Sequence, residues 1–289
     1  MQRRVNFIGC GQLGKTLGSL WHTTGSLVIG SVLTRSLNSA QSAVTTIGAG
    51  TPINKISDMQ RAEIYLIACA DDAIERCSQQ LADSDVLREG DAVFHCSGAQ
   101  SSLLLQACQD RGAVVASIHP IKSFANLALA IDSFAGTYCG VEGDARALAI
   151  LSPLFLSIGA NLLPIHAQHK TLYHAASVIA SNYLVTLQEV SILTFEKAGV
   201  DREAAMAILQ PIVTGTVENV FQLGTSKALT GPIARGDSSV VGSQLAAMKQ
   251  WDKDLATVYQ LLGKLSVPLA AKQGTANAEK LASLRRLLD

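Results

Sequence analysis

Residues 5–14 read Val5-Asn6-Phe7-Ile8-Gly9-Cys10-Gly11-Gln12-Leu13-Gly14, a short apolar run followed by closely spaced glycines. This stretch begins as an apolar strand, and its three glycines complete the spacing G-x-G-x-x-G directly before a helical segment. In a dinucleotide-binding unit the first glycine makes a tight turn, the second admits the pyrophosphate, and the third lets helix and strand pack closely. The phosphates then lie at the positive end of the helix. We therefore expect Gly9, Gly11, Gln12, Leu13 and Gly14 to bind a nucleotide cofactor.

The chain around this loop alternates short apolar runs with helix-length segments. Most runs are continuously apolar, which is typical of parallel strands covered on both faces. The expected strands are residues 4–8, 27–33, 64–69, 92–96, 114–118, 137–141 and 161–165, and the expected helices between them are residues 12–23, 72–81, 102–111 and 144–158. This alternation predicts an α/β fold with a doubly wound, mostly parallel sheet of the Rossmann type.

Strand signals largely stop after residue 165, and long helical patterns rich in Ala and Leu follow. The expected helices are residues 169–198, 201–224, 239–263 and 275–288. A length of 289 residues also favours two domains, at about 150 residues each. We therefore expect a nucleotide-binding domain at residues 1–164 and an all-helical domain for substrate binding and dimerisation at residues 165–289.

Charge is scarce and balanced. Lys and Arg number 23, Asp and Glu also number 23, and charged residues make up 16% of the chain, against about 25% in average soluble domains. A net charge of zero provides no positive electrostatic field to attract the phosphate backbone of a nucleic acid, which argues against that partner. Lys170 is the only formally charged residue from 147 to 188, but Pro153, Gly159 and Pro164 interrupt this stretch and argue against a membrane span. We therefore expect this weakly charged stretch to be buried between the two domains and between the subunits of a homodimer.

The six cysteines are scattered without a Cys-x-x-Cys pair, which is typical of buried thiols in a reducing cytoplasm. The N-terminal apolar run is too short for a signal peptide, so we expect a cytoplasmic location. His166, His169 and His174 are near one another in sequence, but no carboxylate accompanies them at ligand spacing, so no metal site is expected.

The end of the second strand indicates which nucleotide is bound. NAD-binding proteins usually carry an acidic residue there, whereas this chain reads Thr34-Arg35-Ser36 and has no Asp or Glu before Asp58. Arg35 between two hydroxyls suits a 2′-phosphate, which favours NADP over NAD; the alternative is that Arg35 is a solvated loop residue. Ala70, after a later strand, is expected to line the same cofactor site.

Polar side chains follow several strands at the edge where ligands bind in open parallel sheets. Ser97 comes after one strand, and a hydroxyl there would lie near the nicotinamide. His119 and Lys122 follow another; the imidazole can transfer a proton and the ammonium can attract a substrate carboxylate. Asp71 or Asp72 is instead expected to cap the next helix.

The helical half offers further candidates. His174 and Asn182 lie in an otherwise apolar helix and need polar partners, which are either each other, backbone groups or a bound substrate. Arg235 lies in a loop before a helix capped by Asp237 or Ser238, where it can clamp a carboxylate.

The segments 9–14, 119–124, 173–182 and 229–237 together resemble one Rossmann-like family, whose C-terminal half is a domain of unknown function. The resemblance covers nearly the whole chain and extends to ketopantoate reductases, pyrroline-carboxylate reductases, 6-phosphogluconate dehydrogenases and prephenate dehydrogenases. It implies an NADP-binding domain, a helical domain and dimers. His119 and Ser97 match a catalytic His and a Ser of prephenate dehydrogenases. The helical lysine of hydroxyacid dehydrogenases is absent, because Val178 occupies its position before Asn182.

These expectations combine into a functional hypothesis. The chain is expected to be an NADP-dependent oxidoreductase that reduces a small carboxylate-bearing carbonyl compound, with 2-dehydropantoate of pantothenate biosynthesis as the best single candidate. Proton transfer falls to His119, Lys122 or His174, with Asn182 positioning the substrate and Lys122 or Arg235 holding its carboxylate. The alternatives are an imine reductase that resembles pyrroline-carboxylate reductase and a nucleotide-binding sensor without chemistry.

Overall fold

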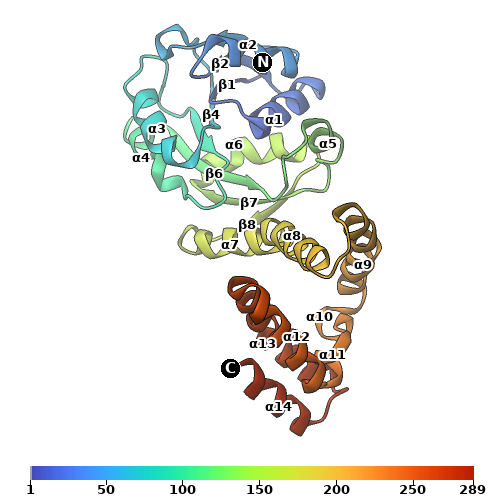
Figure 1. The fold of residues 1–289 in the computed structure, drawn as a ribbon. Helices are drawn as coiled ribbons and strands as arrows, with labels where there is room; N and C mark the ends of the chain where they lie inside the picture. Colours follow the sequence, from blue (N-terminus) through green and yellow to red (C-terminus); the bar gives the residue numbers. More distant parts are fainter. Residues whose placement is uncertain (1) are drawn as a thin grey trace. The chain divides into compact units, whose positions relative to one another are not determined.

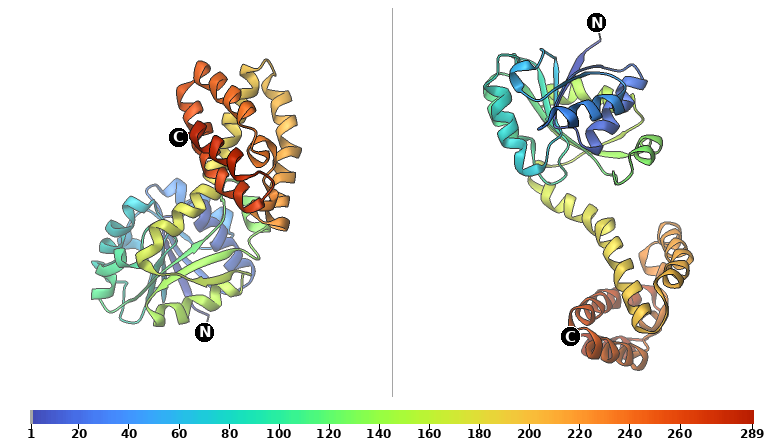
Figure 2. Two further views of the ribbon diagram at one scale, coloured as in Figure 1. Left: turned by 90° about the horizontal axis from the view of Figure 1, so that it is seen from below. Right: turned by 45° about the horizontal axis from the view of Figure 1, so that its top comes forward.

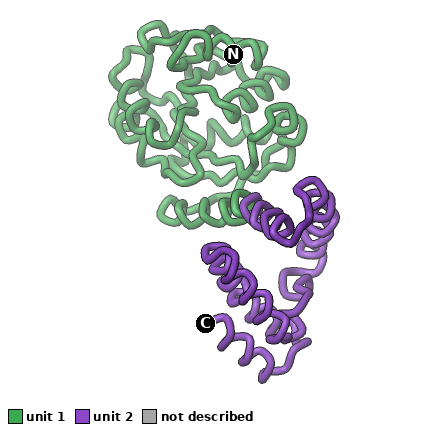
Figure 3. The backbone as a smooth tube through the Cα atoms, in the orientation of Figure 1, with its two compact units in different colours: residues 1–183 green, residues 184–289 purple. Residues whose placement is uncertain are grey.

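The computed structural model describes residues 2–289 and divides into two compact units. The first ends at Tyr183 and the second spans Leu184–Asp289, as coloured in Figure 3. This division falls later in the chain than the boundary expected near Pro164, which remains a prediction about the limits of the domains.

An eight-stranded sheet in the order β3-β2-β1-β4-β5-β6-β7-β8 forms the centre of the first unit (Figure 1). All neighbouring strands pair in parallel except β6 and β7, which are antiparallel. The strands are β1 (Arg4–Ile8), β2 (Val28–Leu33), β3 (Thr51–Ile53), β4 (Ile64–Ile67), β5 (Ala92–His95), β6 (Val114–Pro120), β7 (Tyr138–Gly143) and β8 (Asn161–Pro164). The expected mostly parallel, doubly wound sheet is confirmed.

Helices cover both faces of this sheet, which explains the continuously apolar strands. Along β4, Ile64 and Leu66 pack into one core while Tyr65 and Ile67 pack into the other. Figure 1 shows α1 and α6 on one side of the sheet and α3 and α4 on the other. The longer helices of this unit are α1 (Gln12–Thr23), α2 (Leu37–Ile47), α3 (Ile74–Ala82), α4 (Gln106–Asp110), α5 (Leu127–Asp132), α6 (Ala145–Leu156) and α7 (Lys170–Ala180).

Among the strands and α-helices of the first unit, three were not expected from the sequence: β3, α2 and α5. Helix α2 is rich in Ser and Thr, which favour helices weakly, and only Ala40, Ala43 and Ile47 on it are buried. The Ser36 hydroxyl starts this helix by accepting a hydrogen bond from the Ser39 amide. Tertiary packing and a good cap therefore form a helix that the local sequence favours only weakly.

The second unit is helical throughout its described length. Its helices are α8 (Asn182–Lys197, which begins just before the unit boundary), α9 (Arg202–Leu223), α10 (Thr225–Ala228), α11 (Gly231–Arg235), α12 (Ser238–Trp251), α13 (Lys253–Gln273) and α14 (Ala278–Leu288). Helices α12, α13 and α14 pack side by side (Figure 2) around a core that includes Val241, Val267 and Leu284. Asp237 caps α12, as one of the two residues expected to do so.

Two helices expected to be continuous are interrupted. The one expected over residues 169–198 has a distorted residue at Ser181, with φ −112° and ψ −65°, between α7 and α8. The one expected over residues 239–263 breaks at Asp252, which adopts an extended conformation. Its carboxylate accepts hydrogen bonds from the amides of Asp254 and Leu255, so Asp252 starts α13 as a new helix.

Two helical stretches among residues 2–289 are long and apolar enough to cross a membrane by length and composition, Ala167–Lys197 and Arg202–Leu223. The first contains Lys170, whose side chain is buried in an ion pair with Glu142 of the sheet. Glu189 in the first stretch also pairs with Arg202 at the start of the second, with 2.6 Å between the charged atoms. Length and apolar composition are therefore weak evidence for membrane insertion here.

Candidate active site

The glycine-rich loop has the backbone geometry that its sequence requires. Gly9 has φ 81°, and a Cβ there would lie 2.7–2.8 Å from backbone atoms of Ala68 and Cys69. No other residue fits this position without moving the end of β4. Gly11 caps α1 without a side-chain hydrogen bond, and a Cβ on Gly11 would meet no atom within 4 Å. The first amides of α1 therefore remain available to an anion.

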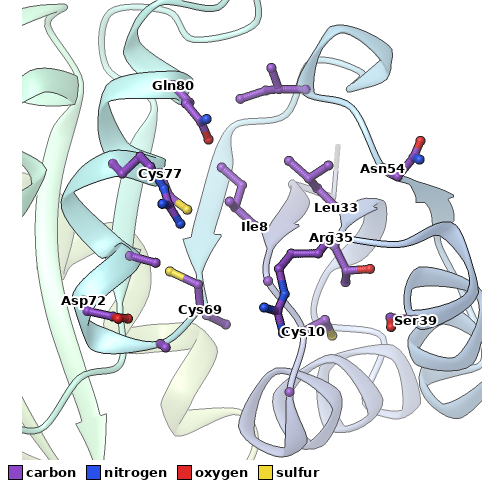
Figure 4. A pocket seen from close by; sticks show the side chains of 18 of the residues that line it. Ile8, Cys10, Leu33, Arg35, Ser39, Asn54, Cys69, Asp72, Cys77 and Gln80 are labelled. Atoms are coloured by element: carbon purple, nitrogen blue, oxygen red, sulfur yellow. The ribbon is translucent and has the colours of Figure 1, made fainter.

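A cleft of about 1120 Å³ opens beside this loop, lined from the ends of β1, β2 and β4 and from α3. Gly9, Gly11, Thr34, Arg35 and Ala70 line it as the sequence predicts. Figure 4 shows the Arg35 side chain projecting into the cleft from the end of β2.

The remaining cofactor candidates lie outside this lining. Gln12 and Leu13 form the first turn of α1, and Gly14 is buried against Cys10 and Ala68. Ser36 serves as the N-cap of α2, and its carbonyl accepts a hydrogen bond from the Thr34 hydroxyl. Ser36 thus shapes the loop that carries Arg35.

His119 lies at the carboxyl end of β6, where its ring meets α7. Its Nδ1 is 3.1 Å from the Tyr173 hydroxyl, and that oxygen accepts a hydrogen bond from the Gly140 amide. A phenol that donates to Nδ1 leaves the proton of the neutral imidazole on Nε2. Burial, together with the nearby His174 and Lys170, lowers the pKa of His119 to about 4.

His174 faces His119 across Gly98, with 5.5 Å between the ring centroids. A Cβ on Gly98 would lie 2.3 Å from His174 Nδ1 and 2.8 Å from His119 Nε2. Within residues 2–289, His174 Nδ1 is buried and has no hydrogen-bond partner. Two imidazole nitrogens thus lie so close to Gly98 that only a glycine fits there, and one of them lacks the partner that a buried polar atom requires.

Ser97 connects this histidine pair to the nucleotide cleft. Its hydroxyl donates to Asp71 at 2.8 Å and accepts hydrogen bonds from the amides of Ala99 and Gln100. The expectation that Asp71 or Asp72 caps the next helix is wrong, because α3 begins without a side-chain cap. Asp71 instead anchors the loop that carries Gly98, next to Ala70 and Asp72 of the cleft wall.

Three residues that were predicted to contact the substrate make no described contact with the His119–His174 pair. The Lys122 ammonium donates to the backbone oxygen of Ser133 at 2.7 Å and to its hydroxyl at 2.9 Å. Asn182 is exposed at the start of α8, just past the distorted Ser181. Arg235, which was expected in a loop, lies instead at the end of the short helix α11 in the second unit, where it is exposed. Their contacts with a substrate remain predictions.

A buried polar network lies beneath the histidines, and it was not expected from the sequence. Lys170 is 1% exposed, and its ammonium contacts the Ser117 hydroxyl and lies 3.2 Å from a Glu142 carboxylate oxygen. Glu142 also accepts hydrogen bonds from the amide and hydroxyl of Ser102. Burial lowers the pKa of Lys170, and the carboxylate opposes this shift. One signal was present: a single acid in the strand 138–143 and a single base in the apolar stretch 147–188.

His95 completes this network on the side of β5. Its Nδ1 accepts a hydrogen bond from the Ser97 amide, and its Nε2 donates to the Ser101 carbonyl. Burial, with a smaller contribution from the positive Lys170, lowers the pKa of His95 to about 4. The network therefore holds the Ser97 loop and α7 on the same sheet edge, which keeps Gly98 between His119 and His174.

Comparison with known proteins gives matches over both halves of the chain. Residues 1–120 match the family model of a Rossmann-like domain, and residues 137–266 match that of a domain of unknown function, DUF2520. A search of curated proteins gave no significant match.

Solved structures resemble the chain over nearly its whole length. Protein TM1727 from Thermotoga maritima is 26% identical with a TM-score of 0.70, covering 93% of this chain and 99% of that one. An imine reductase from Myxococcus stipitatus in complex with NADP+ is 17% identical with a TM-score of 0.64, covering 99% and 100%. A pyrroline-5-carboxylate reductase from Coxiella burnetii is 14% identical with a TM-score of 0.60, covering 91% and 98%.

These neighbours share a reductase-like fold with this chain, and the two family matches correspond to its sheet and to most of its helical part. The chain is accordingly similar to a Rossmann-like domain over residues 1–120 and to the DUF2520 domain over residues 137–266.

Proposed function

We propose that the protein is an NADP-dependent reductase of a small carboxylate-bearing carbonyl compound, with 2-dehydropantoate as the first candidate substrate. One observation carries the proposal: the Tyr173–His119 pair and the unpartnered His174 Nδ1 converge at Gly98, on the sheet edge that also bears the glycine-rich cleft. In open α/β sheets this edge is where a bound nucleotide and its substrate meet.

The residues of the cleft fit NADP. Gly9 and Gly11 leave room for the pyrophosphate at the start of α1, and the Arg35 guanidinium can pair with a 2′-phosphate. When bound, the reduced nicotinamide supplies a hydride to the substrate carbonyl carbon. The imine reductase from Myxococcus stipitatus, which was solved with NADP+, supports this choice of nucleotide.

His119 and Tyr173 supply the proton. His119 Nε2–H donates a hydrogen bond to the substrate oxygen and transfers its proton as that oxygen gains negative charge. Nδ1 then takes the proton of the Tyr173 hydroxyl, and the resulting phenolate keeps the hydrogen bond from the Gly140 amide. Burial raises the pKa of Tyr173 to about 12, still below that of an alkoxide, so the relay runs toward the product. A neutral His119 therefore suffices for this transfer.

His174 and the predicted carboxylate-binding residues orient the substrate. The buried His174 Nδ1 binds a polar group of the substrate, which gives this nitrogen its missing partner. We infer that Asn182, which lies just after α7 in the same unit, contacts the substrate carboxylate, while Arg235 in the second unit stays a candidate from the sequence. Lys122 is the weaker candidate for this role, because Ser133 already accepts two of its hydrogen bonds.

Imine reduction is the second candidate, and the full-length likeness to an imine reductase and a pyrroline-5-carboxylate reductase favours it. The two candidates require different substrates for the same hydride donor. A nucleotide sensor without chemistry would bind NADPH and reduce neither class.

The test is NADPH consumption with a panel of 2-keto acids, including 2-dehydropantoate, beside a panel of cyclic imines. We expect turnover with the keto acids and a decrease in kcat of about 10²–10⁴-fold in His119→Ala, with little change in NADPH affinity. His22→Ala is the matched control, since it removes the same kind of side chain from an exposed position on α1, and kcat should stay within a few-fold. Turnover of imines alone would select the second candidate. Binding of NADPH without any turnover would refute an enzymatic function.

We also propose that the protein is a homodimer that uses its helical unit as the interface. Large apolar side chains are exposed on consecutive helices of this unit, including Val185 on α8 and Ile212 and Phe221 on α9. Large apolar side chains left exposed on two consecutive helices are typical of a surface that another chain covers.

A further inference from the structure

Two cysteines face one another on the wall of the nucleotide cleft. Cys69 follows β4 directly, and Cys77 lies in the first turn of α3. Both line the cleft, as Figure 4 shows, and the two thiols are near enough for each to shift the pKa of the other. Both are also partly exposed, whereas Cys96, Cys108 and Cys139 are buried.

The surroundings of the pair make one thiol reactive. A hydrogen bond from Cys69 and the nearby Arg76 lower the pKa of Cys77 to about 7, so its thiolate is abundant near neutral pH. The pKa of Cys69 is raised because this thiol donates that hydrogen bond. Burial raises the pKa of Cys10, also on the cleft, to about 12. Thiolate character and exposure together determine which cysteine an oxidant attacks.

We propose that Cys69 and Cys77 form an oxidation site in the cleft, at which a hydroperoxide converts the two thiols reversibly into a disulfide. The Cys77 thiolate attacks the peroxide oxygen, an S–O bond forms and hydroxide leaves, giving a sulfenic acid. The Cys69 sulfur then attacks Cys77 Sγ, the S–S bond forms and water leaves. The pair loses two electrons and two protons, and hydrogen peroxide is reduced to two water molecules. A dithiol reverses the change by thiol–disulfide exchange.

Formation of this disulfide alters the part of the cleft next to the glycine-rich loop. A Cβ on Gly9 would lie 2.7 Å from the Cys69 amide nitrogen, so the two segments are in contact. A disulfide requires about 2.05 Å between the sulfur atoms, much less than two unbonded thiols keep. The first turn of α3 and the segment after β4 must therefore move together. We expect weaker nucleotide binding in the oxidised protein, an effect that rests on the proposed function.

The covalent part is tested on the full-length protein with stoichiometric hydrogen peroxide near neutral pH. We expect the intact mass to decrease by two hydrogens, a Cys69–Cys77 linkage in the peptide map, and full reversal by dithiothreitol. Cys77→Ser and Cys69→Ser should each abolish the linkage, while Cys108→Ser, a buried thiol outside the cleft, should retain it. Oxidation at other cysteines, or oxidation of Cys77 to a sulfinic acid without the linkage, would overturn the proposal.

The effect on the cleft has its own measurement. NADPH affinity should decrease at least tenfold on oxidation and recover with dithiothreitol, and saturating NADPH should slow formation of the linkage. If the linkage forms while affinity stays the same, the proposed effect on the cleft is wrong. If the reduced protein does not bind NADPH, the proposed function fails, and the peptide map alone still decides whether the oxidation site exists.

Discussion

The Tyr173 hydroxyl lies 3.1 Å from His119 Nδ1, and this contact joins α7 to the end of β6. His119 pairs with Gly140 across the antiparallel β6–β7 ladder, and the Gly140 amide supplies the other hydrogen bond to the phenol. A Cβ on Gly140 would lie 2.5 Å from the Tyr173 oxygen, so the glycine lets the phenol reach the ladder. The ring orientation and tautomer of His119 therefore depend on three separate elements.

Tyr173→Phe is expected to lower kcat by about 10–100-fold, because His119 Nδ1 loses its proton donor. NADPH affinity should change little, since Tyr173 is not among the residues that line the cleft. Steady-state kinetics separates the two quantities. Tyr138→Phe, which removes an exposed hydroxyl from β7, is the control and should retain the parent kcat. An equal kcat in both variants would contradict the relay.

Gly98→Ala is expected to impair catalysis while leaving the fold intact. Its new methyl group would lie 2.3 Å from His174 Nδ1 and 2.8 Å from His119 Nε2, so both rings must move. Displacement of a reacting group by about 1 Å can cost 10²-fold in rate. Thermal unfolding should show an unchanged fold, and NADPH titration should show an unchanged affinity. The kcat should decrease strongly. Gly215→Ala in α9, where nothing lies within 4 Å, should leave all three unchanged. Full activity of Gly98→Ala would exclude the space over Gly98 as the reaction site.

The cofactor cleft could be predicted from the sequence because its signal is local. Gly9 to Gly14 form a continuous stretch that carries both the turn and the helix start, and Arg35 follows the next strand. Their positions follow from strand–helix alternation alone.

The network below the histidines could not be predicted in the same way. Lys170 meets Glu142 only because β7 runs antiparallel to β6 and α7 returns to the same sheet edge. Neither residue has a local motif. In the sequence Tyr173 is marked only by its place in the segment 173–182, which carries the family resemblance, and its contact with His119 spans 54 residues. Pairings between distant segments depend on topology, which periodicity does not specify.

Two neutral histidines, the buried His95 and the half-buried His119, should make the protein sensitive to acid. The pKa of His95 and of His119 is about 4 in the folded state, against about 6.5 in the unfolded chain. The unfolded chain thus binds more protons between these values, so stability is complete above pH 6.5 and is lost as pH falls toward 4. Each histidine contributes a slope of up to about 1.4 kcal/mol per pH unit in this window.

Urea unfolding at several pH values measures this slope. His95→Gln should flatten it by about one proton, whatever its effect on absolute stability at pH 7. His22→Gln, at an exposed position, should leave the slope unchanged. A parent protein whose stability is constant from pH 6.5 to 4 would contradict the neutral state of the two histidines.

Arg35→Asp should change the nucleotide preference. The guanidinium is the cationic group at the end of β2 that lines the cleft, and its loss removes a charge-assisted interaction with the 2′-phosphate worth about 1.5–3 kcal/mol. NADPH affinity should decrease about 10–100-fold, while NADH affinity is maintained or improved because the new carboxylate can bind the ribose hydroxyls. Titration with both nucleotides gives the ratio. Arg3→Asp, before β1 at the opposite end of the strand, controls for a general change in charge. An unchanged ratio in Arg35→Asp would refute the NADP assignment.

The exposed apolar helices of the second unit are expected to be covered by a second copy of the chain. Phe221 is 85% exposed, and it accompanies Val185 and Ile212 on the two helices that are apolar enough to cross a membrane. A dimer interface accounts for both this exposure and the low fraction of charged residues, since the core of an interface is depleted in charge.

Sedimentation analysis should therefore find a dimer, and the double variant Ile212→Asp/Phe221→Asp should be a folded monomer, because a carboxylate left unpaired in an interface is costly. Leu103→Asp, at an exposed leucine of the first unit, should remain dimeric. Flotation with phospholipid vesicles in a sucrose gradient distinguishes the competing explanation: a monomeric parent that floats with the vesicles would show that a bilayer, rather than a partner subunit, covers these helices. Retention of the dimer by the double variant would place the interface elsewhere on the chain.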